Sequence, residues 1–171
     1  MKSSEKAGSI ALVGLLALWG CSGGPNLEDI EQQNVTIVRE THAALANGDF
    51  EAFEEALAPD YKRHCQAMPP PFQELEGTEE FLAFLQEFVE AVPGYQDTIT
   101  QMIAQGDMVA YVSTMNGVQT GPLGDLPGTG REFTLVNIII QRLENGKIAE
   151  TWVSWDNVAF LTQLGHFPAP E

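Results

Sequence analysis

The stretch that decides the fold lies in the last quarter of the chain. It reads Gly146-Lys147-Ile148-Ala149-Glu150-Thr151-Trp152, followed by Trp155-Asp156 and Gln163-Leu164-Gly165. Asn145 precedes the first glycine, and Asn-Gly tolerates the positive φ angles of a tight hairpin turn. The stretch therefore predicts a turn, a strand over Lys147–Trp155 and a closing helix.

The rest of the second half has the pattern of antiparallel strands. Runs rich in β-branched and aromatic residues alternate with turn-forming segments, which predicts strands over Tyr95–Ala104, Met108–Asn116, Glu132–Leu143 and Lys147–Trp155. Gln105-Gly106-Asp107 joins the first pair, and Glu144-Asn145-Gly146 joins the second. Two hairpins are therefore expected.

The beginning of the chain has the apolar spacing of helices. One helix is predicted from near Leu27 to a stop at Asn47-Gly48. A second, short helix is predicted to end at Pro59, with a buried stripe made of Phe50, Phe53 and Leu57.

A third helix is expected after a loop at Met68–Pro71, where consecutive prolines exclude helix. Thr78 is predicted as its N-cap and Pro93-Gly94 as its end. Its apolar face consists of Phe81, Phe84, Leu85, Phe88 and Val92, which suits a helix packed on a sheet. Helices followed by antiparallel strands indicate an α+β domain with helices on one face of a curved sheet.

The last strand carries the candidate chemistry. Because side chains alternate along a strand, Glu150, Trp152 and Asp156 are predicted to share one face. If that face looks inward, a carboxylate and an indole project into an apolar cavity, and burial raises a carboxyl pKa towards neutrality. A bulge before Asp156 would exchange the two faces.

Each candidate residue also has a structural interpretation. Asp156 precedes a helix and is a favoured N-cap residue, a role that does not exclude acid/base chemistry. His64 suits a proton shuttle, or it anchors the proline-rich loop behind it. Glu150 and Arg142 are expected to pair across the Asn-Gly hairpin. Asn137 is a candidate hydrogen-bond donor on the neighbouring strand, and Trp152 a candidate pocket wall.

Read with Pro59-Asp60-Tyr61-Lys62-Arg63-His64 and Thr129-Gly130-Arg131, the C-terminal stretch resembles the SnoaL-like polyketide cyclases, or ester cyclases. The resemblance extends from about Asn34 to Gly165. It implies the cone-shaped nuclear transport factor 2-like fold, with N-terminal helices packed on a curved antiparallel sheet. It also implies a cofactor-independent enzyme of the aldol cyclase or isomerase type.

The resemblance assigns roles to individual positions. The Trp-Asp pair before the Gln-Leu-Gly helix corresponds to the family's proposed catalytic aspartate, which implies that Asp156 is the general acid/base. The histidine of the Pro-Asp-aromatic stretch faces the pocket in the family, which implies that His64 assists. Tyr61, Trp152 and Asn137 are then the expected substrate-binding residues.

The N-terminus resembles a bacterial lipoprotein signal. Residues 1–20 combine early lysines with a short apolar run, and Leu18-Trp19-Gly20-Cys21 resembles a lipobox. Lipidation of Cys21 is predicted, with residues 21–26 as a tether and residues 27–171 as the domain. Ser22, directly after the cysteine, resembles the residue of lipoproteins that are sorted to the outer membrane. The domain is then expected to face the periplasm. An ordinary secretory signal with a chance cysteine is the alternative.

Composition excludes some functions. A formal net charge of −16 disfavours binding to nucleic acid, because an acidic surface repels phosphate groups. It equally disfavours attraction to an anionic membrane, so the lipid is the only expected membrane attachment. His42 and His166 have no partner at metal-ligand spacing, so no metal is predicted. Cys65 reads as a small apolar filler rather than a nucleophile. The glycine-rich segment Gly117–Gly130 is either a lip over the pocket or a plain long hairpin loop.

The leading interpretation is an exported domain that catalyses proton transfer next to a carbonyl of a small hydrophobic, polyketide-like compound. One alternative is a non-catalytic envelope lipoprotein that binds a hydrophobic ligand. Another is a module that forms a homodimer, or binds a partner, through the open face of the sheet.

Overall fold

A computed structural model describes residues 26–168. The predicted signal peptide and Cys21 lie outside the described residues. Among residues 26–168, no helix is long and apolar enough to cross a membrane.

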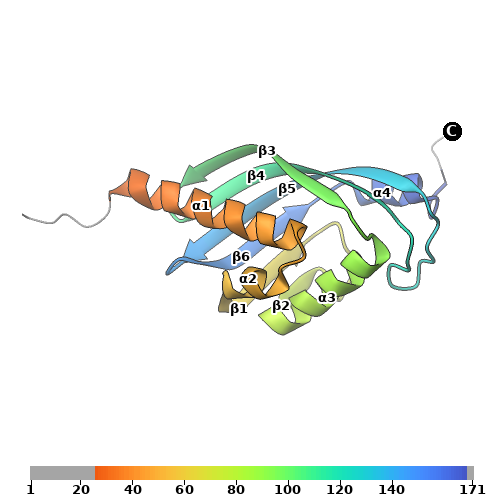
Figure 1. Ribbon diagram of the computed structural model, residues 1–171, viewed down its shortest axis with the longest axis horizontal. Coiled ribbons are helices and arrows are strands. Elements are labelled where there is room, and N and C mark those ends of the chain that lie inside the picture. Colours follow the sequence, from red (N-terminus) through yellow and green to blue (C-terminus); the bar gives the residue numbers. More distant parts are fainter. Residues whose placement is uncertain (1–25, 169–171) are drawn as a thin grey trace, which may run out of the picture.

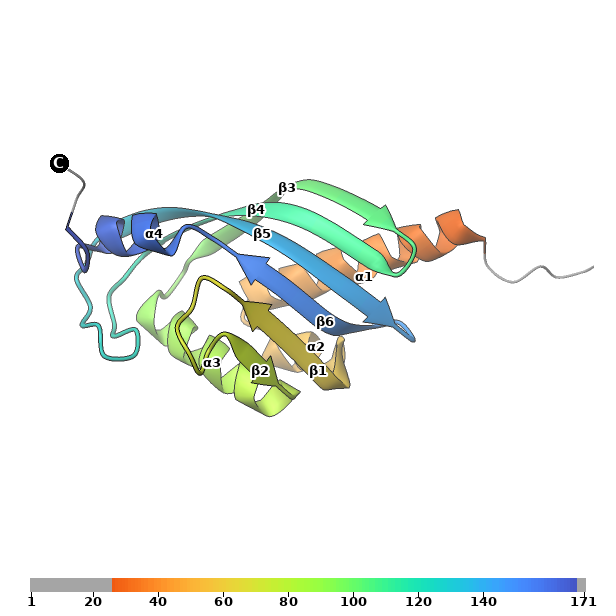
Figure 2. The same cartoon turned by 180° about the vertical axis from the view of Figure 1, so that it is seen from behind.

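Residues 26–168 form a six-stranded sheet, and helices cover one of its faces (Figures 1 and 2). The elements in chain order are α1 (Leu27–Ala46), α2 (Phe50–Glu55), β1 (Leu57–Cys65), β2 (Glu74–Glu76), α3 (Thr78–Ala91), β3 (Gln96–Gln105), β4 (Met108–Val118), β5 (Glu132–Glu144), β6 (Lys147–Ser154) and α4 (Asn157–Leu164). The strand order is β2-β1-β6-β5-β4-β3. The predicted α+β class, with N-terminal helices on a sheet, is confirmed.

The sheet is mixed, whereas a purely antiparallel sheet was expected. β1 runs parallel to β6, and the other neighbouring pairs are antiparallel. The second helix is shorter than predicted: α2 ends at Glu55 instead of Pro59. Leu57 and Pro59 belong to β1. Proline has no N–H to donate to a ladder, and Pro59 falls within an irregular register between Leu57 and Lys62.

The ends of α1 follow the predicted signals, whereas the start of α3 does not. Asn26 caps α1 by accepting the N–H of Asp29 at 2.9 Å, and Asn47 lies at its C-terminal end. Thr78 is not an N-cap: it is the first residue of α3, and Gly77 before it offers no side chain for capping. Gly77 has a φ of 88°, a backbone geometry that threonine would adopt only with strain.

The predicted Asn-Gly hairpin is present between β5 and β6, with φ values of 52° at Asn145 and 76° at Gly146. Directly after it, the strand pairing shifts by one residue. Arg142 lies opposite Glu150, but the next residue, Leu143, lies opposite Ile148. Ala149 is therefore an extra residue in β6, which is a β-bulge.

This bulge exchanges the two faces of β6 relative to the expected alternation. Ile148 is completely buried beneath the helices, and Thr151 and Val153 follow it on the same, helix-covered face. Glu150 and Trp152 lie on the opposite face, which we call the outer face. The condition that the face of Glu150 and Trp152 looks into the cavity is therefore not met, and the stated alternative, a bulge before Asp156 that exchanges the two faces, is present.

The core lies between the helices and the sheet. Buried side chains of the helices meet those of the central strands, and their largest cluster includes Val38, Phe53, Tyr61, Phe81, Val109 and Ile139. Cys65 is buried and unbridged, as expected for an apolar filler.

The segment between β4 and β5 is closed at its base and held against the end of α3. Gln119 is completely buried, and it exchanges backbone hydrogen bonds with Arg131 and Gly130. The N–H groups of Thr120 and Gly121 both donate to the carbonyl of Ala91. The segment is therefore packed onto the domain rather than free.

Gly128 is predicted to be essential to this closure. A Cβ at position 128 would lie 2.2 Å from the backbone oxygen of Thr120, which cannot move without breaking the contact with α3. We expect Gly128→Ala to lower the free energy of unfolding by about 1–3 kcal/mol, the usual cost of overpacking. Urea denaturation measures this, with Asp125→Ala, an exposed position of the same segment, as the control. Equal stability of both variants would contradict the expectation.

Candidate functional site

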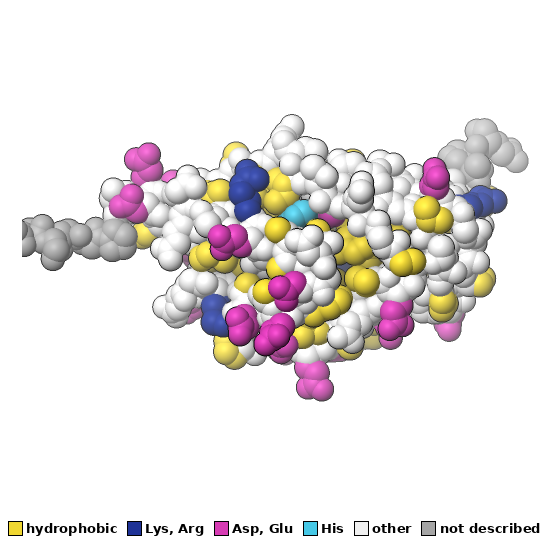
Figure 3. Space-filling model, in the orientation of Figure 1, with side chains coloured by type: hydrophobic (Ala, Val, Ile, Leu, Met, Phe, Trp, Pro, Cys, Tyr) yellow, Lys and Arg dark blue, Asp and Glu magenta, His cyan; other side chains and the backbone are white. Residues whose placement is uncertain are grey.

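A large apolar cavity lies between the helices and the covered face of the sheet. Its volume is about 540 Å³, within the range of small-molecule sites. Figure 3 shows hydrophobic side chains gathered on this side of the molecule. The walls are largely aromatic and aliphatic, and include Phe53, Phe81, Phe84, Phe88, Tyr111 and Trp155.

One wall of the cavity carries a histidine–carboxylate pair. His42, near the end of α1, places Nε2 3.2 Å from Oδ2 of Asp97, at the start of β3. The side chains of His42 and Asp97 are only 14% and 13% exposed. The other carboxylate oxygen, Oδ1 of Asp97, is buried without a hydrogen-bond partner. Asp97 thus has one oxygen fixed by His42 and one available to a ligand.

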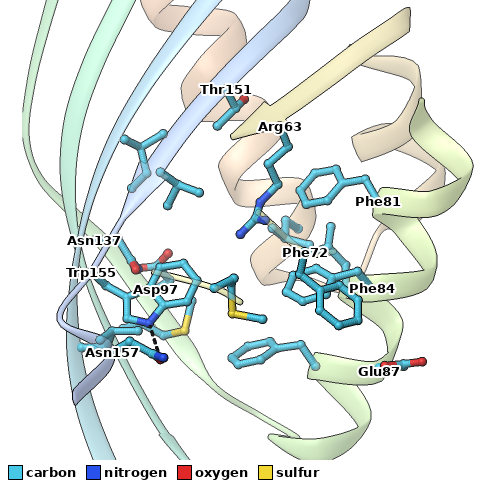
Figure 4. Close-up of a pocket in the computed structure, with 18 of the residues that line it drawn as sticks. Arg63, Phe72, Phe81, Phe84, Glu87, Asp97, Asn137, Thr151, Trp155 and Asn157 are labelled. Atoms are coloured by element: carbon cyan, nitrogen blue, oxygen red, sulfur yellow. Dashed lines mark hydrogen bonds between the residues drawn. The ribbon is translucent and has the colours of Figure 1, made fainter. Parts of the chain in front are cut away.

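A single arginine enters the cavity from β1. Arg63 is 5% exposed, and its guanidinium carbon lies 5.5 and 5.0 Å from the ring centres of Phe81 and Phe84. Figure 4 shows its guanidinium pointing into the cavity, with these rings on one side and Asp97 and Asn137 on the other. Among the described residues, Arg63 forms no ion pair, and its Nη1 has no hydrogen-bond partner.

Neutral polar groups complete the lining. Asn137 is buried and donates from Nδ2 to the hydroxyl of Ser113 at 3.4 Å. Trp155 donates from Nε1 to Oδ1 of Asn157 at 3.2 Å, which fixes its ring in the wall. Gln141 donates to Thr151, and its own amide oxygen has no partner.

The buried phenols stay protonated near neutral pH. Burial raises the pKa of Tyr61 to about 12, and it outweighs the lowering by the Thr151 hydrogen bond and by Arg63. Burial also raises the pKa of Tyr111 far above its ordinary value, with a further contribution from the charge of Asp97. These side chains are therefore neutral hydrogen-bonding groups rather than bases.

The structure separates the residues that the sequence grouped together. Tyr61 and Asn137 line the cavity, and their role in substrate binding stays a prediction. Trp152 does not line it, so its prediction as a pocket wall is wrong, and neither His64 nor Asp156 lines it. Asp156 caps α4, where its Oδ1 accepts the N–H of Ala159 at 2.9 Å.

His64 and Glu150 belong to a charged network on the outer face. Oε1 of Glu150 lies 2.8 Å from Nε2 of His64, and its Oε2 accepts from Nε of Arg142 at 3.2 Å. The other ring nitrogen of His64 contacts Glu74, and the imidazole stacks on Trp152. The predicted pairing of Glu150 with Arg142 is confirmed.

From the sequence, no site role is predicted for three mostly buried side chains of the cavity: His42, Asp97 and Arg63. His42 and Asp97 are 55 positions apart and come from different elements, so no local spacing links them. Arg63 lies in the motif Pro59-Asp60-Tyr61-Lys62-Arg63-His64, in which the family resemblance assigns a catalytic role to His64 alone. Among residues 26–168, no group of three or more His, Cys, Asp and Glu side chains is placed to hold a metal ion.

The glycine-rich segment contributes to the site. Leu123 and Leu126 form a small bridge through reciprocal N–H to C=O hydrogen bonds, and both residues line the cavity. The interpretation of this segment as a lip therefore agrees with its position.

Residues 35–164 match the family model of the SnoaL-like polyketide cyclases. No curated protein matches the chain significantly.

Solved structures show the same fold. IdmH from Streptomyces antibioticus, a candidate polyketide cyclase, is 29% identical, with a TM-score of 0.68 over 78% of this chain and 99% of its own. A candidate SnoaL-like polyketide cyclase from Jannaschia sp. CCS1 is 23% identical, with a TM-score of 0.74 over 86% of this chain and 100% of its own. AclR from Streptomyces galilaeus, a candidate hydroxylase, is 20% identical, with a TM-score of 0.70 over 81% of this chain and 99% of its own.

The outer-face network predicts a pH dependence of stability. Partial burial acts to raise the pKa of Glu150, but hydrogen bonds and charge from His64 and Arg142 outweigh it, and the pKa lies below its ordinary 4.5. A carboxyl group with a lowered pKa stabilises the fold above its unfolded-state pKa, and this contribution is lost as the pH falls through the folded-state pKa. We expect Glu150→Gln to be less stable than the wild type at pH 7, and this difference to become smaller as the pH falls to 3.

Urea denaturation at both pH values measures this difference. Glu40→Gln, at an exposed position of α1, serves as the control and should show no such convergence. A stability gap for Glu150→Gln that is the same at both pH values would rule out the network as its cause.

Proposed function

This chain belongs to the SnoaL-like polyketide cyclase family, and we propose that its cavity catalyses proton removal next to a carbonyl group of an apolar, polyketide-like compound. The observation that carries the proposal is the His42–Asp97 pair, which presents an unpartnered carboxylate oxygen in a largely apolar cavity. Asp97 and His42 take the roles that the sequence assigned to Asp156 and His64.

The proposed step begins with Asp97 as general base. A C–H bond beside the substrate carbonyl breaks, the proton passes to a carboxylate oxygen of Asp97, and the electron pair moves onto the carbonyl oxygen as an enolate. In a cyclisation, the enolate carbon forms a C–C bond to a second carbonyl carbon, whose oxygen then takes a proton. The electrons stay within the substrate, so the step requires no redox cofactor.

The surroundings support this role for Asp97. His42 holds one carboxylate oxygen and so orients the other, the arrangement expected of a positioned base. Apolar walls exclude water, which strengthens electrostatic interactions with a developing negative charge. Asn137, on the same side of the cavity, supplies an amide that suits hydrogen bonding to a substrate oxygen (Figure 4).

A binding protein without catalysis is the second candidate function. It is favoured by the cavity walls, which are largely apolar and would hold a hydrophobic ligand without any chemistry. In this case the His42–Asp97 pair orients the bound ligand and transfers no proton.

We also propose that the protein acts in the cell envelope, anchored by a lipid on Cys21. The proposal rests on the early lysines, the apolar run and Leu18-Trp19-Gly20-Cys21. Stable anchoring would require more than one acyl chain.

Asp97 is predicted to control proton exchange. With 2-tetralone as an apolar ketone probe in D₂O, NMR should show faster loss of the hydrogens beside the carbonyl with the protein than with buffer. We expect Asp97→Asn to reduce the protein-dependent rate about 100-fold or more, because general-base catalysis contributes at least that much.

Asp156→Asn is the matched control, since asparagine also caps helices and position 156 does not line the cavity. Its rate should equal that of the wild type. Binding of 2-tetralone without faster exchange would favour the binding protein, and equal losses in both variants would contradict the role of Asp97.

We further propose that two copies associate through the outer face. A row of side chains crosses this face in register: Trp152 pairs with Ile140, Ile140 with Ala110, and Ala110 with Ile103. Beside it, Ile138 and Val136 of β5 are 60% and 52% exposed. An apolar row flanked by further exposed apolar side chains suits burial against a second copy of the same face.

Sedimentation velocity tests this association. The wild type is expected to sediment as a dimer at about 50 µM, and Ile138→Glu as a monomer, because burial of an unpaired carboxylate is costly. Val158→Glu, at an exposed apolar position of α4, is the control and should remain dimeric. A monomeric wild type at this concentration would rule out the dimer.

A further inference from the structure

The three unpartnered buried polar atoms point to one cavity. Among the described residues, the buried side-chain atoms without a hydrogen-bond partner are Nη1 of Arg63, Oδ1 of Asp97 and Oε1 of Gln141. All three residues line the cavity. Unsatisfied buried polar groups are rare in native proteins, and their concentration in one place is expected where a ligand supplies the missing partners.

Arg63 is the most demanding of the three. An arginine stays charged at any pH that a protein tolerates, and a buried charge without a partner is strongly destabilising. Its contacts with Phe81 and Phe84 stabilise the cation through the ring faces but accept no N–H hydrogen bond. The N–H group at Nη1 is left for an acceptor from outside the protein.

Within residues 26–168, no acidic side chain neutralises Arg63 in the cavity. The carboxyl groups that line the cavity are Asp97, Glu87 and Asp125. Asp97 pairs with His42, whereas Glu87 and Asp125 are exposed. None of the three lies within ion-pair distance of Arg63, and Tyr61 and Tyr111 are neutral phenols.

We propose that Arg63 is a carboxylate-binding residue and that the cavity takes an apolar molecule bearing a carboxylate group. The planar guanidinium matches a carboxylate in geometry and charge, and two N–H groups donate to its two oxygens. The apolar body of the ligand lies against Phe81, Phe84 and the opposite wall. This inference deepens the proposed function by naming the substrate class, and it rests on that function only for the reaction.

The charge of the whole protein does not oppose this ligand at close range. The net charge of −16 repels an anion at a distance, but salt screens this repulsion over about 10 Å at 0.1 M ionic strength. Inside an apolar cavity the nearby arginine dominates, because electrostatic interactions are stronger at low dielectric. The position of Arg63 across the cavity from Asp97 also sets a direction for the ligand, with its carboxylate near β1 and its reactive part near β3 (Figure 4).

Isothermal titration calorimetry with a matched pair of probes tests the proposal. The probes are 2-naphthylacetate and its methyl ester, which share the apolar body and differ in the charge. We expect the wild type to bind the carboxylate at least 10-fold more tightly than the ester. Arg63→Met should remove this preference while still binding the ester, and Arg63→Lys should retain part of it.

Controls separate the inference from folding and from the proposed reaction. Arg142→Met removes an arginine from the outer face and should leave the preference unchanged. Thermal unfolding should show that Arg63→Met is at least as stable as the wild type, because the substitution removes an unpaired buried charge. Asp97→Asn should keep the preference, so failure of the proton-exchange test would not affect this result. Equal affinity of the wild type for both probes, or a preference that persists in Arg63→Met, would overturn the proposal.

Discussion

The site depends on one backbone irregularity, the β-bulge at Ala149. Because side chains alternate along a strand, one extra residue transfers every later side chain to the other face of the sheet. Ile148 before the bulge and Thr151 after it both lie beneath the helices, which strict alternation would forbid. The bulge thereby gives the cavity a wall of Thr151, Val153 and Trp155, and it leaves Glu150 and Trp152 on the outer face.

The two faces of the sheet consequently hold different chemistry. On the outer face, charges are paired with one another and with solvent, as in the network of Glu150, His64 and Arg142. On the covered face, His42 and Asp97 pair, but Arg63 and one oxygen of Asp97 remain without partners. Paired charges stabilise a fold, whereas unpaired buried charges cost stability and are retained where a ligand uses them. This contrast favours the covered face as the proposed site.

The sequence predicts the fold more completely than the site. Helix periodicity, the Asn145-Gly146 turn and the four strands of the second half are local signals, and the structure bears them out. The sequence did not predict β1 and β2, which lie between α2 and α3 along the chain. The bulge at Ala149 has no local signal, since alanine suits either face, and the sequence therefore assigned the wrong face to Trp152. The pairing of His42 with Asp97 depends on how α1 packs against β3, which spacing along the chain does not encode.

NMR of the tryptophan indoles tests most directly which face binds the ligand. Trp155 lines the cavity, whereas Trp152 stacks on His64 on the outer face. When 2-tetralone is added to ¹⁵N-labelled protein, the Nε1–H signal of Trp155 should shift with saturation and that of Trp152 should not, with Trp→Phe variants supplying the assignments. A saturating shift of Trp152 with an unmoved Trp155 would contradict the account.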